Sequence, residues 1–331
     1  MPDTGAVVAA RPASGPGSGP GSDRAPATAR PTRPRFSLTV ITYARDTMLR
    51  RLIAHLEPAL APRDDVEFIL VDNNPDAIDR SGWLAGLGPG LGAVRYLKLG
   101  ENRGVRARND GARAARGDIL VFNDDDVLVE PADFLDRFAA AFAANPALGL
   151  VCARTVMADT GLTPRAYFPH TNKRLPHDRA FKTFRFQANA FAIRRETYAR
   201  VGLMAEDFFY GLEEIDYAYR VIKAGFEIMH LPAVRAVEFN DPGGRRPAPR
   251  VERMRLANKF KISFLHMPLA ALMINLPLFA LYVTVLTRGR VNVAGAFADF
   301  VAWAWRNRAR RSPIDRRTRA YIRACGGQIW K

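Results

Sequence analysis

The chain has 331 residues, 48% of them hydrophobic and 25% charged, which excludes collagen-like, wholly disordered and polytopic membrane proteins and suits about two domains. Its net charge of +16 lies mainly at the ends: residues 1–35 carry five Arg and two Asp (+3), and residues 288–331 carry eleven Lys or Arg and two Asp (+9). The remaining +4 on residues 36–287 predicts no nucleic-acid-binding core, and the basic ends favour a phospholipid or other polyanionic surface.

The first 35 residues are rich in Gly, Ala, Pro, Ser and Arg and contain no aromatic residue, so we expect a disordered tail without a secretory signal. Two cysteines without CxxC or HExxH spacing argue against a disulfide framework or structural zinc and fit a reducing compartment. The composition predicts three parts: the tail at 1–35, a globular domain at 36–245 and a C-terminal helical segment at 246–331.

Short apolar strands alternate with helices in the first half of the body. This alternation predicts an α/β fold with a mostly parallel, helix-covered sheet, whose ligands bind beyond the carboxyl ends of the strands. Polar residues gather at those ends. The expected strands are 36–42, 66–72, 94–99 and 118–123, and the expected helices are 46–60 and 105–115.

The alternation weakens in the second half of this domain. A strand at 148–154 is followed by a predicted loop region at 155–190, which contains three prolines. Helices are expected at 195–201 and 213–224, and Gly225 is suited to end the second one.

The C-terminal segment contains two apolar stretches. Residues 263–287 include no Asp, Glu, Lys or Arg, and as one helix they would reach about 37 Å, enough for a bilayer core, although Pro268 and Pro277 interrupt them. Residues 291–305 carry two tryptophans and run into an arginine cluster, which is typical of a helix lying in a membrane interface. The alternatives are a helical hairpin packed on the catalytic domain or a dimer contact.

Three consecutive acids, Asp124, Asp125 and Asp126, follow the fourth strand. In an extended chain Asp124 and Asp126 would face one side and Asp125 the other. Adjacent carboxylates repel each other, and Mg²⁺ or Mn²⁺ held together with a diphosphate would remove that cost. The alternative is that one acid caps the helix that begins near Ala132.

Glu213, Glu214 and Asp216 form a second acidic group after the aromatic run at 208–210. A carboxylate there could remove a proton from an incoming hydroxyl, and the apolar wall would raise its pKa. The alternative is that acids in a first helical turn only complement the helix dipole.

Residues 101–109 combine Asn, Gly and three Arg ahead of a helix. Such a helix start, with exposed N–H groups, suits a phosphate, and a solvated basic face is the alternative.

In their order and spacing, these motifs resemble those of the family 2 glycosyltransferases, inverting enzymes with the GT-A fold. The resemblance runs from Phe36 to Phe239, and the apolar, basic C-terminal end is similar to the membrane-associating tails of bacterial members that build envelope polysaccharides. The motifs that carry it are Thr42-Tyr43, Val71 to Asn74, Asn102 to Asp118, Phe122 to Asp126, Asn189 to Arg195, and Glu213 to Arg220.

The resemblance implies transfer of a sugar from a nucleoside-diphosphate sugar to a hydroxyl of a saccharide or lipid-linked saccharide, at the cytoplasmic face of the inner membrane. It implies Glu214 as the base, with Glu213 and Asp216 in the same motif, and Mg²⁺ or Mn²⁺ held at Asp124 and Asp126. The implied donor-binding residues are Thr42, Tyr43, Asp72, Asn74, Asn102, Gly104, Arg108, Asp124, Asp125 and Asn189.

The sequence departs from the family where many relatives carry a metal-ligating His after the last strand of the domain. Glu238 stands in that region and could ligate the cation through oxygen. The missing His nevertheless puts metal dependence in question. His230 is interpreted as structural.

Other functions remain open from the sequence. Transfer to a polyprenyl phosphate would need no base, and a non-catalytic relative would bind the nucleotide sugar without transferring it. A nucleotidyltransferase would be expected to begin with a Gly-rich phosphate loop, which Tyr43 to Asp46 is not. A non-enzymatic polyanion-binding protein would leave the acids at the strand ends unexplained.

Overall fold

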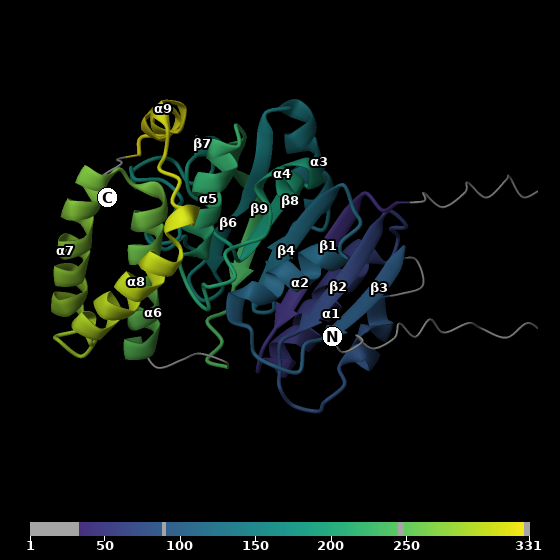
Figure 1. The fold of residues 1–331 in the computed structure, drawn as a ribbon. Helices are drawn as coiled ribbons and strands as arrows, with labels where there is room; N and C mark the ends of the chain where they lie inside the picture. The colour runs from purple at the N-terminus through teal and green to yellow at the C-terminus, as the bar shows by residue number, and fades with distance from the viewer. Residues whose placement is uncertain (1–32, 88–90, 244–247, 328–331) are drawn as a thin grey trace, which may run out of the picture. The chain divides into compact units, whose positions relative to one another are not determined.

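The computed structural model describes residues 33–87, 91–243 and 248–327. Nearly all of the predicted N-terminal tail lies outside these residues. Within them, nine strands form one mixed sheet in the order β3-β2-β1-β4-β8-β6-β9-β5, with β7 on β9 (Figure 1). The strands are β1 (Phe36–Thr42), β2 (Val66–Asp72), β3 (Ala93–Lys98), β4 (Ile119–Asp124), β5 (Val127–Glu130), β6 (Leu148–Met157), β7 (Phe181–Thr183), β8 (Ala190–Arg194) and β9 (Glu227–Glu238).

The predicted α/β class, with its mostly parallel sheet, is confirmed. Strands β1 to β4 are mutually parallel, whereas β8 is antiparallel to both β4 and β6. The prediction of a loop over the whole of 155–190 is wrong at two places. Strand β6 continues to Met157, and β7 forms a short strand that pairs with β9.

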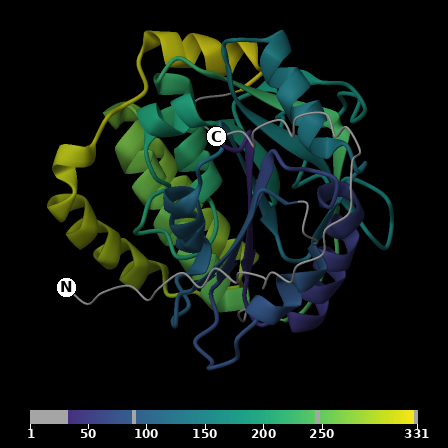
Figure 2. The same cartoon turned by 90° about the vertical axis from the view of Figure 1, so that its right-hand side faces the viewer.

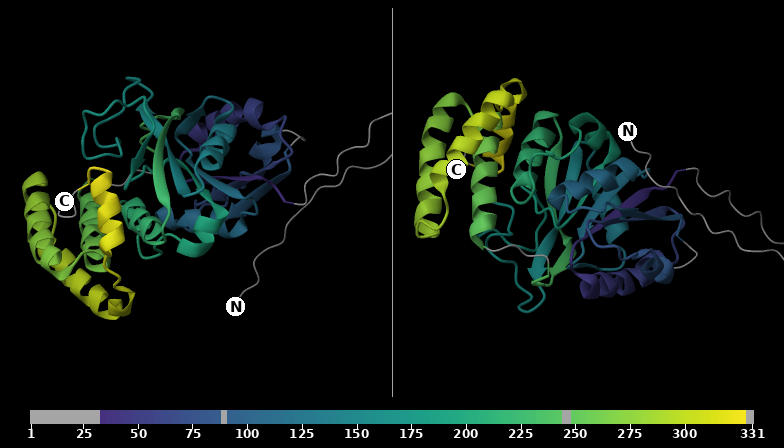
Figure 3. Two further views of the ribbon diagram at one scale, coloured as in Figure 1. Left: turned by 90° about the horizontal axis from the view of Figure 1, so that it is seen from above. Right: turned by 60° about the horizontal axis from the view of Figure 1, so that its bottom comes forward.

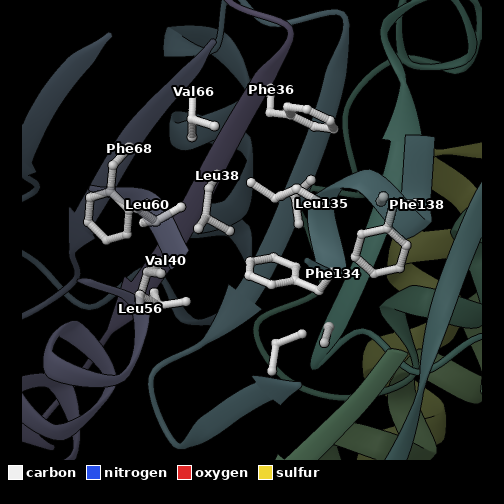
Figure 4. Close-up of a cluster of buried hydrophobic side chains, with 14 of the residues drawn as sticks. Phe36, Leu38, Val40, Leu56, Leu60, Val66, Phe68, Phe134, Leu135 and Phe138 are labelled. Carbon is white, nitrogen blue, oxygen red and sulfur yellow. The ribbon is translucent and has the colours of Figure 1, made fainter. Parts of the chain in front are cut away.

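Two hydrophobic clusters cover the two faces of the sheet. On one face, alternate residues of β1 pack against α1 (Asp46–Leu60) and α3 (Phe134–Ala144), as Figure 4 shows. Helix α1 forms because its leucines and isoleucine recur at three- and four-residue spacing and give it one apolar face. The other face is covered by α2 (Ala107–Ala114), preceded by the 3₁₀ turn η2 (Gly104–Arg106), and by α5 (Glu213–Lys223). Helix α4 (Arg195–Val201) follows β8.

The C-terminal segment forms α6 (Ala248–His266), α7 (Leu269–Leu286), α8 (Val293–Arg306) and α9 (Arg316–Ala324). The apolar stretch at 263–287 is therefore not one helix, because the chain breaks at Met267 and Pro268. Helices α6, α7 and α8 share a third hydrophobic cluster, and α6 packs on α5. Figures 2 and 3 show these helices grouped beside the sheet, with α7 on the side away from it.

Candidate active site

Three parallel strands end together at one edge of the sheet. Thr42 of β1 pairs with Asp72 of β2, and Ile41 pairs with Asp124 of β4, so the polar residues after these strands are brought side by side. A cavity of about 140 Å³ lies there. Its lining residues are Ile41, Tyr43, Arg45, Asn73, Asn102, Gly104, Val105, Arg108, Asp124, Asp125, Phe209, Tyr210 and Gly243.

A buried arginine of α2 joins two of the predicted acidic motifs. Arg108 Nη2 lies 2.6 Å from Asp124 Oδ1, and its Nη1 lies 3.1 Å from Glu213 Oε1. Burial raises the pKa of Glu213, and the charge of Arg108 opposes that shift. The end of β4 and the start of α5 are thus held together by one guanidinium.

A second arginine binds the other two acids of the triplet. Arg45 Nη1 lies 2.9 Å from Asp125 Oδ1 and 3.1 Å from Asp126 Oδ2. The expectation that Asp124 and Asp126 face one side and Asp125 the other is wrong, because β4 ends at Asp124 and the next two residues form a turn. Asp125 instead accepts hydrogen bonds from the Thr42 hydroxyl and the Tyr43 N–H.

Asp126 lies near further carboxylates, which tests whether these residues suit a cation. Burial raises the pKa of Asp126 to about 8, and Asp124, Asp125 and Glu238 add to the shift while Arg45 opposes it. The oxygen donors fit a hard divalent cation, and Arg45 and Arg108 supply the positive charge that pairs with them in this structure. In the described ranges, however, no three His, Cys, Asp or Glu side chains form a ready-made metal site.

Glu238, at the end of β9, contacts Tyr167 and the predicted site residue Asn189. It accepts hydrogen bonds from the Tyr167 hydroxyl at 3.1 Å and from Asn189 Nδ2 at 2.9 Å. The backbone oxygen of Asn189 also accepts from the Asp124 N–H. The structure therefore places Asn189 between Glu238 and the acidic triplet.

The loop before α2 supplies a further wall of the cavity. Gly104 has φ +61°, and an added Cβ would collide with the Phe209 carbonyl oxygen, so this position requires glycine. The Val105 N–H donates to that same carbonyl at 3.0 Å. Asn102 and Asn73 are hydrogen-bonded through their side chains. Asn102 and Gly104 thus both line the cavity.

The three acids of α5 have different surroundings. Burial, followed by the charge of Glu213, raises the pKa of the partly buried Glu214 to about 8. Asp216 lies 2.8 Å from His266 Nε2 and 2.9 Å from Arg220 Nε, away from the Arg108 pair. The structure thus brings Glu213 to Arg108, but it engages Asp216 with the C-terminal helices, and we leave Asp216 out of the reacting groups.

Two residues expected at the donor lie behind the cavity wall. Asp72 is fully buried and binds the Tyr96 hydroxyl, Lys98 and the buried Arg80. Thr42 is also fully buried, on Asp125. A direct contact of either with a ligand in this cavity would therefore need rearrangement, and their role in the described structure is to hold the wall.

Asn74 does not line the cavity, but its side chain holds the backbone of a segment that does. Its Oδ1 accepts from the Ala44 N–H at 2.7 Å, next to a positive φ of 54° at Ala44. This bond holds the chain that carries Tyr43 and Arg45, which both line the cavity.

Four polar or aromatic residues that line the cavity were not among the predicted site residues: Arg45, Asn73, Phe209 and Tyr210. Their positions next to motif residues could have indicated them. Asn73 lies between Asp72 and Asn74, and the aromatic pair precedes the acids of α5. His230, in contrast, is buried against Phe168 and Phe181, which lowers its pKa to about 4 and agrees with the structural interpretation.

The sequence matches glycosyl transferase family 2 over residues 37–202, half of the chain, and the chain therefore belongs to this family. A Haemophilus influenzae protein described as an uncharacterized protein is 29% identical over 142 residues, which are 42% of this chain and 77% of its own. The acids at 213–216 lie beyond the residues matched to the family.

Several solved structures share the fold at low identity. TarS residues 1–349 of S. aureus, in complex with UDP-GlcNAc, has a TM-score of 0.53 at 16% identity, covering 81% of this chain and 80% of that one. The mannosyltransferase PcManGT of Pyrobaculum calidifontis, with GDP-Man and Mn²⁺, has a TM-score of 0.50 at 19% identity, covering 89% and 84%.

GalNAc-T7, solved with UDP, GalNAc and Mn²⁺, has a TM-score of 0.54 at 15% identity, covering 74% of this chain, which spans half of that one. These likenesses establish the GT-A fold. Together, family and fold make the chain a glycosyltransferase, as the resemblance predicted.

Proposed function

We propose that the chain transfers a sugar from a nucleoside-diphosphate sugar to a hydroxyl of a saccharide or lipid-linked saccharide, with inversion at the anomeric carbon. The observation that carries this proposal is the Arg108 bridge, which places the acidic end of β4 beside the acid pair of α5. A donor bound at the acidic end of β4 would present its anomeric carbon toward a base on α5.

In this mechanism Glu214 is the base. Its raised pKa means that the deprotonated carboxylate readily accepts a proton from the acceptor hydroxyl as that oxygen attacks the anomeric carbon. The bond to the nucleoside diphosphate breaks in the same displacement. Glu213, paired with Arg108, disfavours a second negative charge next to it and so supports proton uptake by Glu214.

The donor would be bound by the walls of the cavity. The partly buried Tyr43 offers a ring for a nucleobase, while Asn102, Gly104 and Arg108 lie on the side suited to phosphates. Asn73 holds that side through hydrogen bonds to Asn102 and Gly104. The structures of TarS and PcManGT hold UDP-GlcNAc and GDP-Man, which supports a nucleotide sugar as the donor class.

Asp126 and Glu238, with Asp124, would hold Mg²⁺ or Mn²⁺. When bound, the cation would neutralise the charge that develops on the departing diphosphate. Asp126 would then contact both the cation and Arg45, because Arg45 and Asp126 are ion-paired. Mn²⁺ in the GalNAc-T7 and PcManGT structures supports a divalent cation here.

The place of action that we propose is the cytoplasmic face of the inner (plasma) membrane. In the described part of the chain, α7 alone is long and apolar enough to cross a bilayer, and only 11% of it is buried in the protein. Arginines follow both α7 and α8, which suits anionic lipid. The exposed apolar residues of this α7–α8 face are Leu269, Met273, Ile274, Leu278, Leu281, Tyr282, Val285, Leu286, Phe297, Val301 and Trp305.

Vesicle co-sedimentation tests this location. The protein should bind vesicles that contain anionic lipid, and Leu278→Glu with Leu281→Glu should release it, because both side chains are more than half exposed. Ile78→Glu, at an exposed apolar residue elsewhere, is the matched control and should bind as before. Equal binding by all three proteins would refute the location.

Thermal unfolding with UDP, GDP, dTDP and CMP, each with and without Mn²⁺, tests the donor class. A ligand at about 100 times its Kd should add about 2.7 kcal/mol to the free energy of unfolding. We expect a selective, Mn²⁺-dependent shift that Asp126→Ala removes and that Asp133→Ala, at an exposed acid, retains. No shift with any nucleotide would contradict the proposed function.

A further inference from the structure

The turn that leads into the acid pair of α5 has an unfavourable backbone conformation. Leu212 has φ 67° and ψ 6°, in the left-handed region, and Gly211 before it has φ 81°. For a leucine this region is disfavoured because the Cβ crowds the backbone, and such a residue persists only where its surroundings hold it. The Ile215 N–H then donates to the Leu212 carbonyl at 3.1 Å and begins the helix.

A side chain from the C-terminal segment holds this turn. Asn258 of α6 is buried, and its Nδ2 donates to the carbonyl oxygens of Tyr210 at 3.2 Å and Gly211 at 2.8 Å. It lies 46 residues beyond Leu212 in the chain and outside the residues matched to the family. The Leu212 side chain also packs against the core cluster under α5.

We propose that Asn258 is a positioning residue for the acids of α5. By fixing two successive carbonyls it keeps Leu212 left-handed, and this conformation sets the direction in which Glu213 reaches Arg108 and Glu214 is presented. The proposal rests on the proposed function in one respect, the role of Glu214 as the base. It gives the C-terminal helices a part in catalysis besides any contact with a membrane.

The part of the donor wall formed by Gly104 and Phe209 is anchored separately from Asn258, which holds Tyr210 in another part of the wall. The Phe209 carbonyl accepts from the Val105 N–H on the other side of the loop, and Gly104 packs closely against it. Loss of Asn258 should therefore displace the acid pair more than the donor cavity. The signature is a fall in kcat without a matching loss of nucleotide affinity.

The test combines Asn258→Ala with two substitutions of Leu212. Asn258→Ala should lower kcat by about 10- to 100-fold, as expected for a misplaced catalytic group, while the Kd of the nucleoside diphosphate changes less than about threefold. Adding Leu212→Gly should restore part of kcat, because glycine adopts the left-handed conformation without a clamp. Adding Leu212→Ala should not, because alanine loses the same packing but keeps the Cβ. Arg253→Ala, at an exposed residue of α6, is the control.

Hydrogen exchange gives a readout that needs no substrate. Amides at 211–216 should exchange faster in Asn258→Ala and more slowly again when Leu212→Gly is added. The exchange rates of the α2 amides should stay the same in all variants. Unaltered kcat and exchange in Asn258→Ala, or equal rescue by Leu212→Gly and Leu212→Ala, would overturn the positioning role. Full turnover in Glu214→Gln would instead overturn the proposed base, and the exchange data would still decide whether Asn258 holds the turn.

Discussion

Arg108 Nη2 lies 2.6 Å from Asp124 Oδ1, and this ion pair is formed by a nearly buried arginine. The other terminal nitrogen of the same guanidinium binds Glu213. A planar fork can hold two carboxylates at once, whereas the ammonium of a lysine is a single compact charge. Because of this geometry, β4 and α5 are placed relative to each other by one side chain of α2, and the proposed donor and base regions share it.

Glu214→Gln should lower turnover by about 10²- to 10⁴-fold, because the amide cannot accept the proton of the acceptor hydroxyl. Nucleotide affinity should be kept, since the change removes no group that lines the cavity. Steady-state kinetics with a nucleotide titration measure both. Glu196→Gln, at an exposed acid of α4, is the control and should retain full turnover.

The rate should rise with pH up to about 8. Glu214 acts as a base only when deprotonated, and burial with the Glu213 charge raises its pKa to about 8, against the opposing charges of Arg108 and Arg255. Below that value kcat/KM should fall by about tenfold per pH unit. A rate profile that is flat between pH 6 and 8 would contradict this assignment.

The same group should make the protein less stable as the pH rises. Its folded pKa exceeds the ordinary carboxyl value, so between the two values the folded state keeps a proton that the unfolded state has released. The free energy of unfolding should therefore decline from the ordinary carboxyl range to about pH 8. Urea unfolding at pH 6 and pH 8.5 should show a smaller decline for Glu214→Gln.

Glu238→Ala should weaken the stabilisation of the protein by Mn²⁺ with a nucleoside diphosphate. The substitution removes one of the oxygen donors near Asp126, whereas Glu238→His supplies a nitrogen ligand in its place and should keep the effect. Thermal unfolding with and without Mn²⁺ measures it. Glu130→Gln, at the end of neighbouring β5, should behave as the unaltered protein, and an unchanged Mn²⁺ effect in Glu238→Ala would exclude Glu238 as a ligand.

Arg80→Ala should destabilise the fold by about 1.5–3 kcal/mol, because the fully buried Asp72 loses one charged partner and keeps Lys98 and the Tyr96 hydroxyl. Arg80 also binds Asp46 and Asp76, which lie at the start of α1 and in the loop after β2. Chemical denaturation measures the change. Arg200→Ala, at an exposed arginine with one ion pair, should cost less than about 0.5 kcal/mol.

Strands β1, β2, β3, β4 and β6 and helices α1, α2, α4 and α5 were predicted because each carries its own local pattern, whereas β5, β8 and β9 were not predicted. Strands β1 and β2 were predicted to the residue, and α4 as well, because each is a continuous apolar or amphipathic run ended by polar residues or glycine. The short β7 was missed, since its three residues are defined by pairing with β9 rather than by any pattern of their own.

The sequence by itself determined which residues could do chemistry: the acidic triplet after β4, the acid pair of α5 and the Asn-Gly loop before α2, all set by residue type and local spacing. Only the tertiary structure decided their partners. It turned Asp72 inward to Arg80, engaged Asp216 with His266, brought Arg45 to the acidic triplet and placed Asn258 on the carbonyls of Tyr210 and Gly211. The physical reason is that burial and charge pairing depend on side chains far apart in the chain, and no local pattern encodes which of them will meet.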